Sequence, residues 1–304
     1  MVIAIKNLKR QGYRIALDDF VMEERYKPLL PLADIIKLEL PAMSAAELKG
    51  TITHLKTFSA SLLAEKIETM AEYKLCKDLG CDLFQGYFLS KPEIVKGRKL
   101  PQNKLAVLQL IGELQNPAVN VTQLNEIISK DPTLSFKLLK LVNSAAYRRA
   151  RTIESIHMAV MMLGISKIKS WSSLLALSKM EDKPIALRQI SLARAKLCEL
   201  LSAKLSPEQS DLYFTTGLLS SLDVYFDTPL KELLLSIPLE GTISDALIHY
   251  RGKAGLALHT AKHYEQSKWQ AIHWNLLEKF NISKLELNQL YIESAVWAGE
   301  HAEE

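Results

Sequence analysis

The sequence has little cysteine and no long apolar run. Its 304 residues include three cysteines, Cys76, Cys81 and Cys198, an odd number that offers neither a disulfide framework nor the paired CxxC spacing of a zinc site. No stretch approaches the roughly 18 uninterrupted apolar residues of a membrane span. The apolar opening MVIAI is too short for the core of a secretory signal. These absences favour a protein of the reducing cytoplasm.

An excess of charge of one sign is also lacking. The chain has 38 Lys and Arg against 34 Asp and Glu, a formal net charge of +4, and the excess is spread along the chain. So mild a balance does not by itself favour a nucleic-acid or membrane partner. We interpret the basic run Arg148-Arg149-Ala150-Arg151 as a solvated loop or salt-bridge donor rather than a phosphate site. We therefore expect neither nucleic acid nor membrane as a partner.

The length and composition of the chain, with 48% apolar and 24% charged residues, are typical of a globular protein of about two domains. Residues 1–93 alternate between strand and helix patterns. Residues 94–104 carry the glycine, proline and charge of a linker. From 105 to 299 apolar residues recur at helical spacing without strand alternation. The sequence thus predicts an α/β region, a linker and an all-helical domain.

Four short strand patterns in the first region each end in polar residues. They lie at residues 14–19, 35–38, 62–65 and 83–86, with helical patterns at 51–58 and 69–79, and Gly80 is expected to end the latter helix. Strands separated by helices imply a parallel sheet. Four βα units are half of a closed (β/α) barrel, so we predict a partial TIM-like barrel. The chain opens in a helical pattern that leads straight into a strand, and we expect further sequence upstream.

The polar residues at these strand ends form a candidate phosphodiester site. Carboxylates such as Asp18, Asp19 and Glu65 are ligands for hard divalent cations, and an adjacent pair can contact two ions. Lys37 could neutralise charge in a transition state, and Gln85 could orient water. Each residue alone is more typical of a loop. Together, at successive strand ends, they favour a phosphodiester site or its remnant.

These residues and their neighbours resemble the second half of EAL domains. The matching segments, in the family's order, are Asp18-Asp19-Phe20, Lys37 in IIKLEL, Ala64–Thr69 (AEKIET) and Gln85-Gly86-Tyr87 with Lys91-Pro92. EAL domains are TIM-barrel-like phosphodiesterases that linearise cyclic di-GMP with Mg²⁺ or Mn²⁺. The resemblance implies that Asp18, Asp19 and Glu65 match metal-binding carboxylates. It also implies that Lys37 matches the site lysine and Gln85 the site glutamine.

The chain also departs from the EAL pattern. The EAL tripeptide and the Asn and Glu ligands of the earlier strands would lie before Met1. Val21 stands where the pattern has Gly after DDF, Glu39 replaces the Asp after the lysine, and Lys66 replaces the Gly of AEGVE. An ammonium beside Glu65 would compete with a metal ion. We predict a degenerate site that needs no cofactor in this form and takes Mg²⁺ or Mn²⁺ only if it is completed.

The helical region, about residues 100–280, resembles the HDOD domain, a relative of HD phosphohydrolases without the metal-binding His-Asp doublet. The resemblance rests on Asn143–Tyr147 (NSAAY), Leu163-Gly164, Gly217–Ser220 (GLLS) and Tyr264-Glu265. Where an HD enzyme has its doublet, this chain has Ser220-Ser221, and hydroxyls cannot replace imidazole and carboxylate as ligands. His259 and His263 would share a helix face, but HTAKH lacks the glutamate of HExxH. We interpret them as packed or surface histidines.

These features predict a bacterial signal-transduction regulator linked to cyclic di-GMP that acts as a non-catalytic scaffold or protein-interaction module. The helical domain would bind an unknown signalling protein, and cyclic di-GMP and a second copy of the chain are further candidate partners. The alternative is a cyclic-di-GMP phosphodiesterase, if the natural protein contains the other half of the barrel. Ser220-Ser221 disfavours an HD-type phosphohydrolase. The open edges of four parallel strands favour association through residues 1–93.

Overall fold

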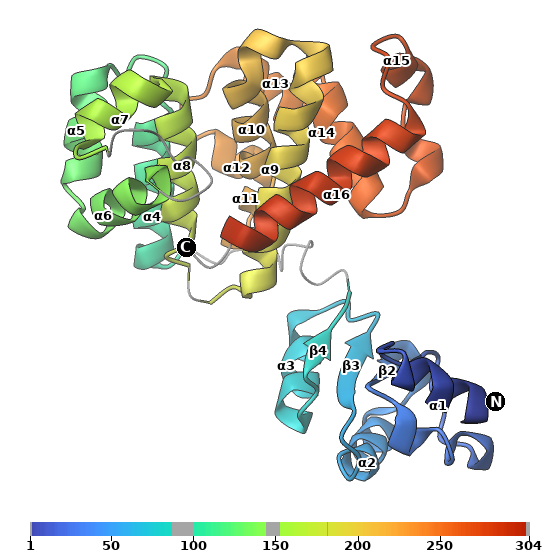
Figure 1. Cartoon of the computed structure of the whole chain (residues 1–304). Coiled ribbons are helices and arrows are strands. Elements are labelled where there is room, and N and C mark those ends of the chain that lie inside the picture. Colours follow the sequence, from blue (N-terminus) through green and yellow to red (C-terminus); the bar gives the residue numbers. More distant parts are fainter. Residues whose placement is uncertain (1, 87–99, 144–152, 181, 302–304) are drawn as a thin grey trace. The chain divides into compact units, whose positions relative to one another are not determined.

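The computed structural model describes residues 2–86, 100–143, 153–180 and 182–301 and divides the chain into two compact units, Met1–Glu93 and Ile94–Glu304 (Figure 1). The first unit is α/β, and the second is helical throughout its described residues. None of the helices in the described ranges is long and apolar enough to cross a membrane.

The first unit is built on a four-stranded parallel sheet whose strands lie side by side in sequence order, as the alternation of patterns predicted. The strands are β1 (Ala16–Leu17), β2 (Ile35–Glu39), β3 (Ser61–Glu65) and β4 (Leu83–Phe84). The helices are α1 (Val2–Arg10), α2 (Ala45–Leu55) and α3 (Met70–Leu79), with short 3-10 helices η1 (Glu24–Tyr26), η2 (Leu30–Leu32) and η3 (Leu40–Ala42). β1 and β4 are shorter than the patterns predicted.

Local capping explains where α2 and α3 begin and end. The side chains of Ser44 and Thr69 each accept a hydrogen bond from the backbone N–H three residues on, and a glutamate side chain returns to the cap, which makes two capping boxes. α2 therefore starts at Ala45, before the predicted residue 51. Gly50 within this helix lowers its stability, relative to alanine, by only about 1 kcal/mol. Gly80 ends α3 in the left-handed conformation, at φ 92°, as predicted.

Side chains alternate along the strands and give the sheet two unlike faces. Ile36, Leu38, Leu62 and Ala64 are buried in the core of the first unit, together with apolar residues of α2 and α3. The opposite face carries Lys37 and its register partner Leu63, both only half-buried. The candidate catalytic lysine therefore lies on the less covered face.

The second unit consists of helices packed around one long central helix, α9 (Ile185–Leu205), against which α10, α14 and α16 pack most extensively (Figure 1). The other elements before it are α4 (Gln102–Gln115), α5 (Val121–Ser129), α6 (Pro132–Val142), α7 (Ile156–Leu163) and α8 (Ile165–Leu177). After it come η6 (Pro207–Gln209), α10 (Ser210–Leu219), α11 (Leu222–Phe226), α12 (Leu230–Leu234), α13 (Gly241–His249), α14 (Gly252–Glu265), η7 (Trp269–Ala271), α15 (Trp274–Glu278) and α16 (Lys284–His301).

Close approach of α10 to α9 depends on Gly217. A methyl group at this position would lie 2.6 Å from the Cα atom of Ala195 and 2.9 Å from the carbonyl oxygen of Arg194. No side chain fits that space, because real Cβ contacts are longer. Glycine therefore brings the C-terminal end of α10, and Ser220 after it, against Arg194.

Several element boundaries differ from the sequence prediction. Within the predicted helical region, α10 and α11 are separated at Ser220 and Ser221, because the Ser220 hydroxyl donates to the Gly217 carbonyl oxygen at 2.7 Å and competes with the helical pattern. Residues 269–278 of that region form the 3-10 turn η7 and the short helix α15 rather than one continuous helix. α4 begins at Gln102, directly after Pro101 and inside the expected linker 94–104. Residues 94–99 of that linker lie outside the described residues, and α16 runs two residues past the expected boundary at 299.

Candidate functional site

Asp18 after β1, Lys37 in the middle of β2 and Glu65 at the end of β3 come together, so Lys37 does not end its strand as the pattern predicted. The Lys37 ammonium nitrogen lies 2.8 Å from Asp18 Oδ1 and 2.7 Å from Glu65 Oε1. Lys37 is the register partner of Leu63, so Glu65, two residues further along β3, is within reach of its long side chain. Asp18 directly follows β1. We call these three residues the strand-end triad.

The strand-end triad is a charged cluster that is partly shielded from water. The side chain of Glu65 is 9% exposed, that of Lys37 22% and that of Asp18 64%. The hydrogen bond from Lys37 lowers the pKa of Asp18. Hydrogen bonds to Asp18 and then to Glu65 raise the pKa of Lys37. The Lys37 ammonium group therefore bridges the side chains of Asp18 and Glu65.

Asp19 and Gln85 lie at the same end of the sheet, but their side chains are exposed and form no hydrogen bond to the triad among the described residues. Asp19 adopts a left-handed backbone, at φ 46°, which aspartate tolerates better than most residues. Gln85 is held by its backbone, whose N–H donates to Ala64 O at 2.8 Å and whose carbonyl accepts from Ile67 N at 3.1 Å. The next residue must be glycine, because a methyl group at Gly86 would lie 2.0 Å from Ile67 O.

Two of the departures from the EAL pattern contact each other. Lys66 has a left-handed backbone, at φ 56°, a conformation that glycine adopts without strain. This geometry gives the physical reason for the glycine that the EAL pattern has there. The Lys66 ammonium forms an ion pair with the carboxylate of Glu39, and this hydrogen bond raises the pKa of Lys66.

Two ammonium groups lie among the carboxylates that the EAL resemblance matches to metal ligands. Within the described part of the chain, no three His, Cys, Asp or Glu side chains are arranged to hold a metal ion. The Lys37 ammonium occupies the space between the carboxylates of Asp18 and Glu65, and Lys66 places a second cation nearby. Positive groups at this position compete electrostatically with Mg²⁺ or Mn²⁺.

In the helical unit, a buried guanidinium takes the position next to Ser220 and Ser221. Nη1 of Arg194 donates to the two serine hydroxyls at 3.1 and 3.0 Å. Nε and Nη2 donate to the carboxylate of Glu265 at 3.0 and 2.6 Å. Burial opposes the charge on Arg194, but attraction and hydrogen bonding to Glu265 outweigh it and raise the pKa of Arg194. A permanent cation thus lies where the sequence lacks the metal-binding doublet.

The two serines could be identified from the sequence, whereas Arg194, which lies 26 residues before Ser220, was not predicted as their partner. The available signal was an arginine among the apolar residues of the long helix 185–205. Such a residue is rarely buried without a partner. The partner could not be named from the sequence, because three different helices meet at this point.

His259 stacks against two other histidines. The centroid of its ring lies 4.0 Å from that of His263 and 4.4 Å from that of His273, with interplanar angles of 30° and 11°. Nδ1 of His263 is 2.8 Å from the carbonyl oxygen of His259. Burial, followed by the two neighbouring histidines, lowers the pKa of His259 to about 4. Near-parallel rings do not point their nitrogens at a common centre, so the arrangement fits packed histidines rather than a metal site.

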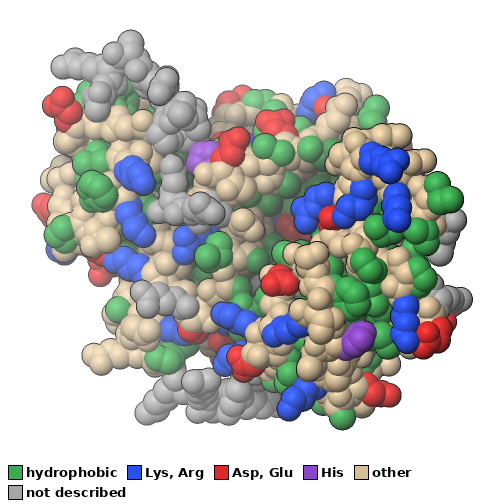
Figure 2. Space-filling view, turned by 60° about the horizontal axis from the view of Figure 1, so that its bottom comes forward, with side chains coloured by type: hydrophobic (Ala, Val, Ile, Leu, Met, Phe, Trp, Pro, Cys, Tyr) green, Lys and Arg blue, Asp and Glu red, His purple; other side chains and the backbone are tan. Residues whose placement is uncertain are grey.

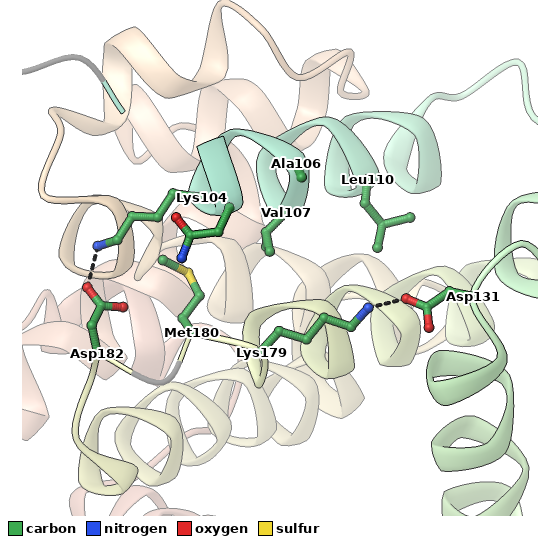
Figure 3. Close-up of a pocket in the computed structure, with 9 residues that line it drawn as sticks. Lys104, Ala106, Val107, Leu110, Asp131, Lys179, Met180 and Asp182 are labelled. Carbon is green, nitrogen blue, oxygen red and sulfur yellow. Dashed lines mark hydrogen bonds and ion pairs between the residues drawn. The ribbon is translucent and has the colours of Figure 1, made fainter. Parts of the chain in front are cut away.

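A pocket of about 380 Å³ lies between α4 and the segment that follows α8 (Figure 3). Its apolar part is formed by Val107, Leu110 and Met180, with Ala106. Lys104 and Asp182 form an ion pair of 2.7 Å at one end, and Lys179 and Asp131 form another at the opposite end. No sequence motif marks these residues, and the pocket was not predicted.

Basic side chains are dispersed on the face shown in Figure 2, where Lys and Arg are interspersed with acidic and apolar residues. The basic run at residues 148–151 lies outside the described residues. The interpretation of that run as a solvated loop therefore stays a prediction.

Two family models match the chain, the EAL domain over residues 2–92 and the HDOD domain over residues 100–280. The uncharacterized protein YuxH of Bacillus subtilis is 33% identical over 307 residues, covering 98% of this chain and 74% of that protein. The cyclic di-GMP phosphodiesterase CdgJ of Vibrio cholerae is 32% identical over 304 residues, covering 97% and 69%. The probable cyclic di-GMP phosphodiesterase PdeA of Escherichia coli is 36% identical over 101 residues, covering 29% and 14%. The chain therefore belongs to the family of proteins in which an EAL domain is followed by an HDOD domain.

Proposed function

We propose that this protein is a cyclic di-GMP signalling regulator that acts as a non-catalytic scaffold. The EAL and HDOD domains, and relatives named for cyclic di-GMP hydrolysis, support the link to this dinucleotide. The observation that carries the non-catalytic role is Lys66, a cation that stands where the EAL pattern has glycine and lies next to the candidate metal ligand Glu65. The Arg194 cation beside Ser220-Ser221 supports the same role for the helical unit, because it would repel a metal ion there.

The four βα units are proposed to form part of a TIM-like barrel. In such barrels functional groups gather at the carboxyl ends of parallel strands, which is where Asp18, Lys37 and Glu65 meet. The less covered face of the sheet, with Leu63 and Lys37, would then turn toward the barrel interior. Cyclic di-GMP would bind over the strand ends, with its anionic phosphodiesters facing Lys37 and Lys66.

The helical unit is proposed to dock a signalling protein in the cytoplasm. The pocket in Figure 3 offers an apolar floor between two ion pairs, which suits an apolar side chain flanked by polar groups. Lys104 is 7% exposed and also donates to the carbonyl oxygen of Tyr225 at 3.0 Å, so the Lys104 end of the pocket is held rigidly. Rigid pockets lose less entropy on binding.

The alternative function is hydrolysis of cyclic di-GMP. The observation that favours hydrolysis is the close approach of Asp18, Lys37 and Glu65, because a catalytic site also needs these side chains near one another. It requires additional oxygen ligands, because hard divalent cations take about six. A further segment of barrel would have to supply them and draw Lys37 away from the carboxylates.

Calorimetric titration of the full chain with cyclic di-GMP, with and without Mg²⁺, alongside an assay for the linear dinucleotide, separates these functions. Binding without turnover is the expected result and supports the scaffold. Turnover that Asp18→Ala abolishes, while Asp78→Ala at an exposed position of α3 leaves it intact, would establish the enzyme. If neither binding nor turnover is observed, cyclic di-GMP is excluded from the proposal, and a protein-interaction module remains.

A further inference from the structure

The last helix, α16, packs against α9 with one of its faces (Figure 1). Leu287, Ser294 and Ala298 are buried on that face. They lie seven and four residues apart, which places them on one side of an α-helix. The opposite side of α16 is therefore not used in this contact.

That opposite side carries a second row of residues, which we call the outer stripe. It consists of Leu285, Gln289, Ile292, Val296 and Gly299. Successive members are four and three residues apart in turn, the spacing of positions d and a in a helix that packs along another helix. The stripe runs about 21 Å along the helix axis. Its three large apolar side chains, Leu285, Ile292 and Val296, are 69%, 54% and 59% exposed, so they contact mainly solvent.

The described residues give no reason for glycine at position 299. Its backbone is helical, and a methyl group at this position would meet nothing within 4 Å. Glycine is unfavourable in a helix relative to alanine. On the outer stripe, however, the missing side chain lets the backbone of another helix come close. Gly299 therefore supports helix packing on this side of α16.

One edge of the outer stripe is acidic. Glu286, Glu293 and Glu300 follow one another at intervals of seven residues, which places all three at the heptad position e beside the stripe. Glu286 is paired with Lys204 at 3.3 Å. Glu293 and Glu300 are exposed and form no ion pair with any described residue. Two carboxylates beside the stripe are thus available to a partner.

A second copy of α16 would not complement this acidic edge. In an antiparallel pair of α16 helices the glutamates at position e would face each other, and like charges across an interface disfavour association. In a parallel pair they would face position g, which holds Asn288 and Ala295. Neither residue is a cation. The acidic edge therefore complements a helix that differs from α16 and carries basic residues.

We propose that the outer stripe is a docking surface for an amphipathic helix of another protein, one whose apolar face is flanked by a row of Lys or Arg. The apolar residues of that helix would pack on Leu285, Ile292 and Val296, and its basic row would pair with Glu293 and Glu300. The outer stripe shares no residue with the pocket in Figure 3. The proposal also does not depend on cyclic di-GMP binding.

The test uses two designed helical peptides of about three heptads, with Leu at positions a and d and either Lys or Glu at positions e and g. Fluorescence anisotropy of each labelled peptide with the full chain measures binding. We expect the Lys peptide to bind, with an affinity that falls as salt is added, and the Glu peptide not to bind. Equal binding of the two peptides, or binding of neither, would overturn the proposal.

Variants of the full chain locate the binding surface. Ile292→Lys should weaken binding of the Lys peptide about tenfold or more, because it removes the centre of the apolar row and adds a like charge. Leu235→Lys, at a position of the same unit that is 89% exposed, is the matched control and should bind as the parent does. Glu293→Lys combined with Glu300→Lys should reverse the preference toward the Glu peptide. A double variant that still prefers the Lys peptide would refute the assigned surface.

Two further measurements on Ile292→Lys separate this proposal from the others. Light scattering should give the same mass as for the parent chain, and a lower mass would assign the outer stripe to a second copy instead. Titration with cyclic di-GMP should match the parent, because the outer stripe lies in the helical unit. Loss of peptide binding with unchanged cyclic di-GMP binding is therefore the expected result.

Discussion

The Lys66 ammonium forms an ion pair with the carboxylate of Glu39, and both residues stand where this chain departs from the EAL pattern. Glu39 ends β2, and its register partner on β3 is Glu65, the residue before Lys66. The two departures therefore meet across neighbouring strands. The change from Asp to Glu keeps a carboxylate at position 39, and this carboxylate neutralises the cation that Lys66 adds at the edge of the candidate site.

A double-mutant cycle on Lys66→Gly and Glu39→Asp should reveal this coupling. Lys66→Gly relieves a left-handed backbone that costs about 1 kcal/mol for residues other than glycine, but it leaves Glu39 without its partner. Because the two side chains are 60% and 26% exposed, we expect a small favourable coupling between them. Urea unfolding of the four proteins measures it. The Glu24–Lys27 pair, 85% and 56% exposed, is the control and should couple less; equal coupling would contradict the inference.

Removing Arg194 should destabilise the helical unit strongly. Arg194→Met leaves the Glu265 carboxylate, 12% exposed, without a cation, and breaking such a pair costs about 3–5 kcal/mol. The double variant Arg194→Met with Glu265→Met should lose less than the sum of the single changes. Lys204→Met, which breaks an exposed pair with Glu286 of 3.3 Å, should change the free energy of unfolding by about 0.5 kcal/mol or less. Similar losses for Arg194→Met and Lys204→Met would refute a structural role for the buried cation.

The first unit should mediate self-association through the less covered face of its sheet. Leu83 on β4 is 39% exposed and is the register partner of Leu63 on that face, and open sheet edges favour pairing with another chain. Light scattering should give the mass of a dimer for the parent chain. It should give the mass of a monomer for the variant Leu83→Lys. Leu75→Lys, at a position of α3 that is 40% exposed, is the matched control and should remain dimeric. A parent chain that is monomeric at every concentration would contradict this prediction.

Stability of the helical unit should fall as the pH decreases from about 6.5 to about 4. Burial and the neighbouring histidines lower the pKa of His259 to about 4 from the ordinary value of 6.5. In that interval the unfolded chain binds a proton that the folded chain does not, so the free energy of unfolding decreases with decreasing pH. We expect a loss of about 1–2 kcal/mol, reduced from the full shift because the ring is partly exposed.

The difference between His259→Gln and the parent chain isolates this contribution. Urea unfolding at neutral and at mildly acidic pH should show a smaller loss in His259→Gln than in the parent. His157→Gln, at an exposed position, should lose as much as the parent. An unchanged pH dependence in His259→Gln would exclude the histidine stack as its source.

Much of the architecture could be predicted from the sequence, because it depends on local patterns. Alternating patterns predicted the parallel sheet, helical spacing predicted the all-helical region, and Gly80 marked the end of α3. The candidate residues Asp18, Lys37 and Glu65 could be found because each follows or ends a short apolar run, and the ends of parallel strands gather at one edge. The loss of metal ligands at Ser220-Ser221 was also visible, because it is a matter of residue type.

Only the tertiary structure decided which side chains meet. Glu39 and Lys66 are 27 residues apart, and Arg194 and Glu265 are 71 residues apart. Their pairing depends on strand register and on the close approach of α10 to α9 at Gly217. The pocket between Lys104–Asp182 and Lys179–Asp131, and the stack of His273 on His259, likewise arise where distant segments pack. The periodicity of the sequence determines which face of a helix or strand is apolar. The position of one element against another depends on the packing of the whole core. This relative position determines which charged side chains form pairs.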